Sequence, residues 1–292
     1  MSATAQPKMS APIAGVRTDD VTIEGHAGQI ALRLYRPQPH QAAPSGEDGV
    51  VVPLGARLPT VMYFHGGGFT RGSLDDGDAA AHYLASQVPA LVVSVAYSLA
   101  PQHPFPAAPE DAYRAALWAY RHARRFGGDA RRMGVAGHDA GGNLATALAM
   151  IARDRGEIEI GAQALLAPLL DPSMTRLGDV KLPSDVEARE CAACYRAYLP
   201  HAAQRLHPYA APLESRRLAG LPPALIASAE HDLLHVEAEK YAGELIAAGV
   251  PTQVTRHRSA SHGALAALPA ALSEVAAFFT RQLALPPVGH NK

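Results

Sequence analysis

The sequence predicts an α/β protein with a mostly parallel central sheet flanked by helices, and three observations support this prediction. Short apolar runs alternate with helical stretches along most of the chain, as expected for parallel strands joined by crossover helices. The runs are apolar on both faces, as in strands buried within a parallel sheet. The alternating segment from Val21 to Arg36 predicts an antiparallel hairpin that enters this sheet.

The expected elements follow in order along the chain. Buried strands are predicted at residues 60–64, 90–96, 133–136, 162–166 and 224–229. Helices are predicted at residues 77–87, 108–125, 142–155, 235–248 and 264–283. The segment 173–215 interrupts the alternation with a helical piece, Asp185 to Leu199, between proline-rich ends. Such an insertion is typical of a small helical lid over the carboxyl ends of the strands. Residues 1–17 are expected to form a loose N-terminal arm of a single domain that spans 1–292.

Composition narrows the function classes. The 292 residues include 26 basic and 27 acidic side chains, a formal net charge of −1, which speaks against nucleic acid as the main partner. Two cysteines exclude a disulfide framework. The sequence has no apolar run long enough to span a membrane, and residues 1–15 lack the apolar stretch of a secretory signal. We therefore expect a cytoplasmic globular protein that acts on a small molecule, without a nucleic-acid or membrane partner.

The segment GHDAGG, residues 137–142, is the central motif of the sequence. It lies between the short strand RMGVA and the helical stretch NLATALAMIARD. A strand, a tight glycine-flanked turn and a helix are typical of a nucleophile elbow, in which the middle side chain projects above the sheet. Asp139 occupies this middle position. The alternative is a glycine-rich turn whose aspartate only caps the helix.

Backbone donors for such an elbow are expected in HGGGF, residues 65–69, directly after the buried strand TVMYF. The N–H groups of Gly66 and Gly67, with that of Ala140, would form an oxyanion hole.

The acid and the base of the predicted site follow later strands. Asp232 comes just after the buried run ALIASAE, and His262 comes just after the strand-like QVTRHR. We expect His262 to carry the proton and Asp232 to fix its tautomer, in the chain order nucleophile, acid, base. His257 lies inside the strand pattern and His231 lies beside Asp232, so both are weaker candidates.

Together with longer motifs, these residues resemble the hormone-sensitive-lipase-like esterases of the α/β-hydrolase superfamily. The resemblance covers about Val21 to Leu283 and rests on three further segments: HGGGF with the following Gly-Ser, YSLAPQHPFP followed by EDA, and HPYAAPL. It implies the α/β-hydrolase fold, ester hydrolysis and assembly as a homodimer. We also expect Phe69, Tyr97 and His138 to contact the substrate.

The sequence departs from this family in its key motifs. The family elbow reads Gly-Asp-Ser-Ala-Gly-Gly, so Asp139 stands where the family has its serine. In the family's acid motif, Asp-Pro-Leu-x-Asp-Glu, Leu233 replaces the proline and Val236 replaces the second aspartate. The elbow GHDAGG is instead similar to the GHDxGG elbow of epoxide hydrolases and related dehalogenases, whose aspartate attacks the substrate.

The chemistry of an aspartate leaves three functions open. A carboxylate that attacks an acyl carbon leaves a high-energy anhydride, whereas attack on an epoxide or haloalkane carbon leaves an ordinary ester. Asp139 could instead activate water against a small apolar ester or lactone, for which general-base catalysis contributes about 10²–10⁴-fold. The third function is non-catalytic ligand binding. An epoxide route needs an acid, for which the lid offers Tyr195, Tyr198 and Tyr209.

No metal or cofactor is expected. Cys191 and Cys194, with His201 and His207, offer four zinc-binding side chains, but their spacing matches no standard zinc finger. The sequence has no Walker loop and no GxGxxG after the first buried strand.

Overall fold

The computed structural model describes residues 15–38, 57–177 and 182–284. Most of the predicted N-terminal arm lies outside this part of the chain. Its last two residues, Val16 and Arg17, already belong to the first strand, β1.

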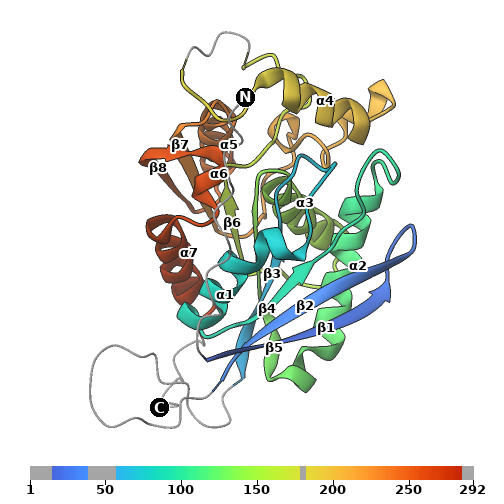
Figure 1. Ribbon diagram of the computed structural model, residues 1–292, viewed down its shortest axis with the longest axis vertical. Helices are drawn as coiled ribbons and strands as arrows, with labels where there is room; N and C mark the ends of the chain where they lie inside the picture. The colour runs from blue at the N-terminus through green and yellow to red at the C-terminus, as the bar shows by residue number, and fades with distance from the viewer. Residues whose placement is uncertain (1–14, 39–56, 178–181, 285–292) are drawn as a thin grey trace, which may run out of the picture.

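The described residues form an eight-stranded sheet in the order β1-β2-β4-β3-β5-β6-β7-β8 (Figure 1). The strands are β1 (Val16–Glu24), β2 (Gln29–Pro37), β3 (Leu58–Phe64), β4 (Leu91–Val95), β5 (Gly128–His138), β6 (Ala162–Leu166), β7 (Ala224–His231) and β8 (Thr252–Ser261). The pairs β1–β2 and β2–β4 are antiparallel, and all the other pairs are parallel. The predicted mostly parallel sheet, entered through an antiparallel hairpin, is therefore confirmed.

Helices cover both faces of the sheet. The helices of the two layers are α1 (Asp78–Gln87), α2 (Ala107–His122), α3 (Ala140–Arg155), α5 (His235–Ala247) and α7 (Pro269–Gln282). Side chains of α2, α3 and α5 share one hydrophobic core, and those of α1 and α7 share the other. Strand β3 supplies both cores, since Met62 and Phe64 enter the first and Val61 and Tyr63 the second. This alternation follows from the two-residue period of a strand.

The predicted helix 264–283 is divided into two. The short helix α6 (His262–Leu265) ends before α7 begins at Pro269. Leu268 is extended, with φ −72° and ψ 117°, because a following proline disfavours the helical conformation. Proline is well suited to the first position of a helix, where its missing N–H has no partner to lose. His262 therefore opens a short helix of its own.

The predicted lid segment contains α4 (Ala188–Tyr198) and two 3₁₀ turns, η3 (Ala202–Leu206) and η4 (Pro212–Glu214). Four of its residues, 178–181, lie outside the described residues. Helix α4 lies at the top of the view in Figure 1, apart from the helices that cover the sheet. Its Tyr198 ring stacks on Phe69, with 3.9 Å between the ring centroids. The predicted lid helix therefore packs against the loop that follows β3.

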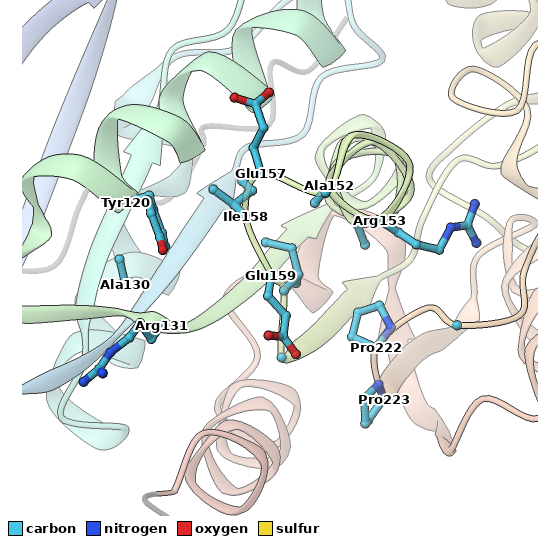
Figure 2. A pocket seen from close by; sticks show the side chains of 15 residues that line it. Tyr120, Ala130, Arg131, Ala152, Arg153, Glu157, Ile158, Glu159, Pro222 and Pro223 are labelled. Atoms are coloured by element: carbon cyan, nitrogen blue, oxygen red, sulfur yellow. The ribbon is translucent and has the colours of Figure 1, made fainter.

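A hollow of about 650 Å³ lies at the opposite end of the sheet (Figure 2). Its lining includes Ile160 and Gly161, just before β6, and Pro222 and Pro223, just before β7. None of the predicted catalytic residues lines this hollow. Among the described helices, none is long and apolar enough to cross a bilayer.

Candidate active site

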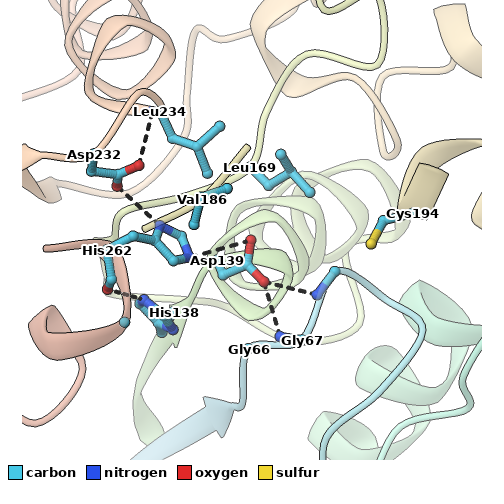
Figure 3. A network of polar contacts seen from close by, with 12 residues as sticks. Gly66, Gly67, His138, Asp139, Leu169, Val186, Cys194, Asp232, Leu234 and His262 are labelled. Atoms are coloured by element: carbon cyan, nitrogen blue, oxygen red, sulfur yellow. Dashed lines mark hydrogen bonds and ion pairs between the residues drawn. The ribbon is translucent and has the colours of Figure 1, made fainter. Parts of the chain in front are cut away.

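The predicted catalytic residues meet at one edge of the sheet. The HGGGF loop follows β3, Asp139 follows β5, Asp232 follows β7 and His262 follows β8. These four strands are parallel, so their carboxyl ends share an edge, the usual position of a site in open α/β sheets. Figure 3 shows the side chains of Asp139, Asp232 and His262 together.

The elbow holds Asp139 in a strained backbone conformation, which is sterically possible because nearby positions in the turn are glycines. Asp139 has φ 55° and ψ −120°, a backbone region that non-glycine residues rarely adopt and that is common at functional sites. A Cβ atom at Gly137 would lie 2.2 Å from the carbonyl oxygen of Gly141. At Gly141 it would lie 2.1 Å from that of Phe64. The turn can therefore be this sharp only with glycine at both positions.

Two backbone N–H groups bind the Asp139 carboxylate. Those of Gly67 and Gly68 donate to its Oδ2 atom, at 2.9 and 2.8 Å. The sequence-based expectation named Gly66 and Gly67, with Ala140. In the structure the second donor of the loop is Gly68. Gly66 instead packs on the residue before Asp139, since a Cβ at Gly66 would lie 2.7 Å from the Nδ1 atom of His138. Ala140 opens α3, where the first backbone N–H groups have no partner within the helix.

The imidazole of His262 lies between two carboxylates. Its Nδ1–H donates to Asp232 Oδ2 at 3.0 Å. Its Nε2 atom is 3.8 Å from Asp139 Oδ1, which is too long for a hydrogen bond but close enough for an ion pair. Asp232 is fully buried and also accepts the N–H of Leu234 at 2.9 Å. Asp232 therefore fixes the ring and leaves Nε2 facing Asp139.

The charges of this site stabilise one another. Burial alone would raise the pKa of Asp139, but the positive charge of His262 and the N–H groups of Gly67 and Gly68 hold it below its usual value. Burial alone would lower the pKa of His262, but the hydrogen bond to Asp232 and the charge of Asp139 raise it. The two shifts favour a positively charged His262 ring facing a negatively charged Asp139.

His138, expected to contact the substrate, is hydrogen-bonded within the protein. Its Nε2–H donates to the carbonyl oxygen of His262 at 2.9 Å. Burial, helped by the positive charge of His262, lowers the pKa of His138 to about 4. The His138 ring is therefore neutral near pH 7, and its Nε2–H is used within the protein.

Phe69 and Tyr97, also expected to contact the substrate, pack inside the protein. Phe69 is fully buried under Tyr198. The Tyr97 hydroxyl donates to the carbonyl oxygen of His65 at 2.9 Å, and the two rings stack at 4.4 Å. Both side chains therefore support the loop that carries Gly67 and Gly68.

Residues that the sequence analysis did not assign to the active site surround Asp139 and His262. Figure 3 shows these side chains at the site: Leu169, Val186, Leu234 and Cys194. Cys194 of α4 packs on Gly68, since a Cβ there would lie 2.5 Å from its Sγ atom. These side chains make the surroundings of the carboxylate mostly apolar. They come from three loops and the lid helix, and no motif in the sequence marks them.

The lid also binds the loops that carry the acid and the base. The hydroxyl oxygen of Ser184 accepts the N–H of Leu233 at 3.2 Å. The two carboxylate oxygens of Asp185 accept the N–H groups of His262 and Gly263, each at 2.9 Å. These contacts could not be predicted from the sequence, because they join segments more than 45 residues apart.

The other candidate side chains lie elsewhere or have other partners. The Tyr209 hydroxyl donates to Asp154. His257 Nε2 is 3.4 Å from Glu274 of α7, and His231 is exposed at the end of β7. Tyr195 and Tyr198 are buried on α4, and burial raises the pKa of both hydroxyls.

Within the described residues, no three His, Cys, Asp or Glu side chains are grouped so that they could hold a metal ion. This holds for the zinc-binding set considered above, Cys191, Cys194, His201 and His207, all of which are described.

A model of the alpha/beta hydrolase fold family matches residues 61–266, a range that contains Asp139, Asp232 and His262. The chain belongs to the α/β-hydrolase fold family. It is 40% identical to the esterase LipI of Mycobacterium tuberculosis over 253 residues, which are 85% of this chain and 75% of LipI. It is 36% identical to an ethyl acetate hydrolase of Pseudomonas putida, over 80% of this chain and 70% of that protein.

Similarity to solved structures supports the same family. The thermophilic carboxylesterase EstE1, cloned from a metagenomic library, superposes with a TM-score of 0.82 and 34% identity, over 95% of this chain and 92% of EstE1. The expected membership of the hormone-sensitive-lipase-like branch of the α/β-hydrolases is confirmed, and the protein is a hydrolase.

Proposed function

We propose that the protein hydrolyses small apolar carboxylic esters or lactones without a cofactor. The observation that carries this proposal is the pairing of Asp139 with His262 at the elbow of a chain related to carboxylesterases. Apolar side chains around the pair, such as Leu169 and Val186, favour an apolar substrate.

Each residue has a step in this reaction. Asp139 takes a proton from water, and the water oxygen attacks the acyl carbon. The imidazolium of His262 then gives a proton to the departing alkoxide, so the carbon–oxygen bond breaks and the alcohol leaves. The proton on Asp139 passes to His262, which restores the resting charges. Asp232 holds the ring throughout by its bond to Nδ1.

The geometry also limits the rate of this reaction. Asp139 Oδ2 accepts the N–H groups of Gly67 and Gly68. An ester carbonyl oxygen must therefore displace Oδ2 before these two N–H groups can stabilise it. One such donor typically contributes 10²–10³-fold to the rate of acyl transfer. We therefore expect ester cleavage by the wild-type protein to be slow.

Asp139→Ser tests this proposal, because serine frees both donors and supplies a hydroxyl that His262 can activate. With short-chain p-nitrophenyl esters and a lactone, we expect kcat/KM to rise about 100-fold or more in this variant. Asp139→Asn keeps the oxygen acceptor but cannot take a proton, so its activity should be lost. Wild-type activity in Asp139→Asn would contradict the proposal.

A second candidate function is hydrolysis of an epoxide or haloalkane through an alkyl ester of Asp139. The observation that favours it is that Oδ2 is already held by Gly67 and Gly68, while Oδ1 faces His262. Oδ1 would attack a saturated carbon, and the carbon–oxygen or carbon–halogen bond would break. The imidazolium would protonate an epoxide oxygen and become neutral, whereas in the haloalkane route it would release its proton to solvent. Neutral His262 could then take a proton from the water that attacks the ester carbon of Asp139, with the oxyanion formed at Oδ2. The bond from that carbon to Oδ1 then breaks, and the alcohol leaves with a proton from His262.

This candidate has a covalent intermediate that can be weighed. In His262→Gln the water step should fail, whereas halide departure needs no acid, so a haloalkane should leave its alkyl group on the peptide that contains Asp139. Mass spectrometry of that peptide measures the adduct, and His82→Gln, a buried histidine of α1, is the control. An unmodified peptide after prolonged incubation with a haloalkane would exclude this route for haloalkanes.

A further inference from the structure

The main chain of His262 is bound on both of its polar groups by side chains from distant segments. Its N–H donates to Asp185 Oδ1 of the lid at 2.9 Å. Its carbonyl oxygen accepts the Nε2–H of His138 at 2.9 Å. His138 is 124 residues away in the chain and Asp185 is 77 residues away. These two bonds fix the peptide groups on either side of the Cα atom that carries the imidazole.

Both side chains are suited to this role by their chemistry. A carbonyl oxygen can only accept, so His138 must carry its proton on Nε2. The His138 ring is nine-tenths buried and lies 4.6 Å from the His262 ring, measured between centroids. Asp185 accepts two adjacent N–H groups, of His262 and Gly263, with its two oxygens. Those N–H groups belong to the first turn of α6, where they have no partner within the helix.

We propose that His138 and Asp185 are positioning residues that hold the main chain of His262, so that its Nε2 atom faces Asp139. The proposal rests on the proposed function in one respect, that His262 carries the proton. It adds that His138, next to Asp139, and Asp185 of the lid affect catalysis through His262.

Charge gives the two residues different effects on His262. The groups around its imidazole are Asp139, Asp232, Asp185 and His138. The negative charge of Asp185 contributes to the raised pKa of His262. His138 is neutral near pH 7, because burial and the charge of His262 oppose its protonation. Loss of Asp185 should therefore lower the pKa of His262, whereas an amide in place of His138 should leave it almost unchanged.

The reach of the side chain at position 138 separates positioning from general packing. The amide nitrogen of His138→Gln lies about as far from Cα as Nε2 of the imidazole, whereas the amide of His138→Asn is too short. We expect kcat to fall less than about 5-fold in His138→Gln and about 100-fold in His138→Asn, with KM nearly constant, since a misplacement near 1 Å can cost that much. Equal kcat in the two variants would overturn the role of His138. His82→Asn, at a buried histidine of α1, is the matched control.

Asp185 is tested in the same way. Asp185→Asn keeps one acceptor and loses the charge, and Asp185→Ala loses both acceptors. We expect kcat to fall about 10-fold in the first and about 100-fold in the second, with the pKa of His262 lowered in both. Asp129→Ala, at a carboxylate near the start of β5 that accepts the N–H of Arg131, should leave kcat unchanged. Wild-type kcat in a folded Asp185→Ala would overturn its role.

A readout without substrate keeps this proposal separate from the proposed function. The Nδ1 proton of His262, bonded to Asp232, should give a low-field proton NMR signal. We expect this signal to persist in His138→Gln and Asp185→Asn, and to be lost to solvent exchange in His138→Asn and Asp185→Ala. An unchanged signal in the latter two would overturn the positioning roles, even if no ester proved to be a substrate. A signal lost as expected, in a protein inactive on all esters, would contradict the proposed function alone.

Discussion

Two loops place a carboxylate on either side of the same imidazole, and they do so differently. After β7, Asp232 is fully buried and lies within hydrogen-bond distance of His262 Nδ1. After β5, Asp139 has a strained backbone conformation, and its Oδ1 atom lies 3.8 Å from His262 Nε2. Both Asp232 oxygens are hydrogen-bonded, whereas among the described residues only Oδ2 of Asp139 has hydrogen-bond partners.

The difference shows how a folded chain assigns separate tasks to one side-chain type. Asp232 uses its hydrogen-bonding capacity to fix a ring and a loop, which is a supporting role. Asp139 keeps its Oδ1 atom facing the His262 ring among mostly apolar side chains, so this oxygen stays available to react. The strain at the elbow is the local feature that goes with this free position.

The largest expected effect comes from removing the free carboxylate. Asp139→Asn should lower kcat/KM for a short-chain ester by about 10³-fold, because the amide cannot take a proton, while its melting temperature should change little. Steady-state kinetics and a thermal melt measure the two quantities. Asp20→Asn, at an exposed aspartate of β1, is the control. If activity and stability fell together, the division between the two carboxylates would be wrong.

The supporting carboxylate should show the opposite balance. Asp232→Ala leaves the Leu234 N–H and the His262 Nδ1–H without their acceptor, at a fully buried position. We expect the free energy of unfolding to fall by about 1–3 kcal/mol and kcat to fall about 100-fold through misplacement of the ring. Urea titration checks the first value. A variant as stable as wild type would show that Asp232 does not support the loop.

A third buried carboxyl sharpens the comparison, because its pKa is shifted in the opposite direction to that of Asp139. Glu237 accepts the N–H groups of Leu170 and Asp171, but burial and the charge of Asp171 raise its pKa to about 8. An unfolded glutamate titrates near pH 4.3, so between these values only the unfolded chain releases the proton. Wild-type stability should then fall by about 1.4 kcal/mol per pH unit from this group.

Glu237→Gln keeps the acceptor and cannot titrate, so its stability should lack this dependence. Urea titrations of both proteins at about pH 5, 6 and 7 give the two slopes. Parallel slopes would mean that Glu237 is ionised, and that a facing imidazolium is not what separates Asp139 from it.

Sequence reasoning reached the parts of this site that short motifs encode. The glycines around Asp139, and the positions of Asp232 and His262 after their strands, follow from local geometry and parallel order. The sequence could not indicate which backbone N–H groups bind Asp139, because Gly66, Gly67 and Gly68 differ only in how the loop turns.

The contact of Asp185 could not be predicted for a related reason, since its partner His262 is brought to it only by the folding of the lid. Pro269, by contrast, could have been recognised as the start of a separate helix.

The most direct test of the central claim is a single turnover of a short-chain ester in oxygen-18 water, followed by mass spectrometry of the acid product and of the Asp139 peptide. If Asp139 acts as a base on water, the label should appear in the acid alone and the peptide should keep its mass. Label in the Asp139 carboxylate would contradict this account and show that the carboxylate itself attacks the substrate.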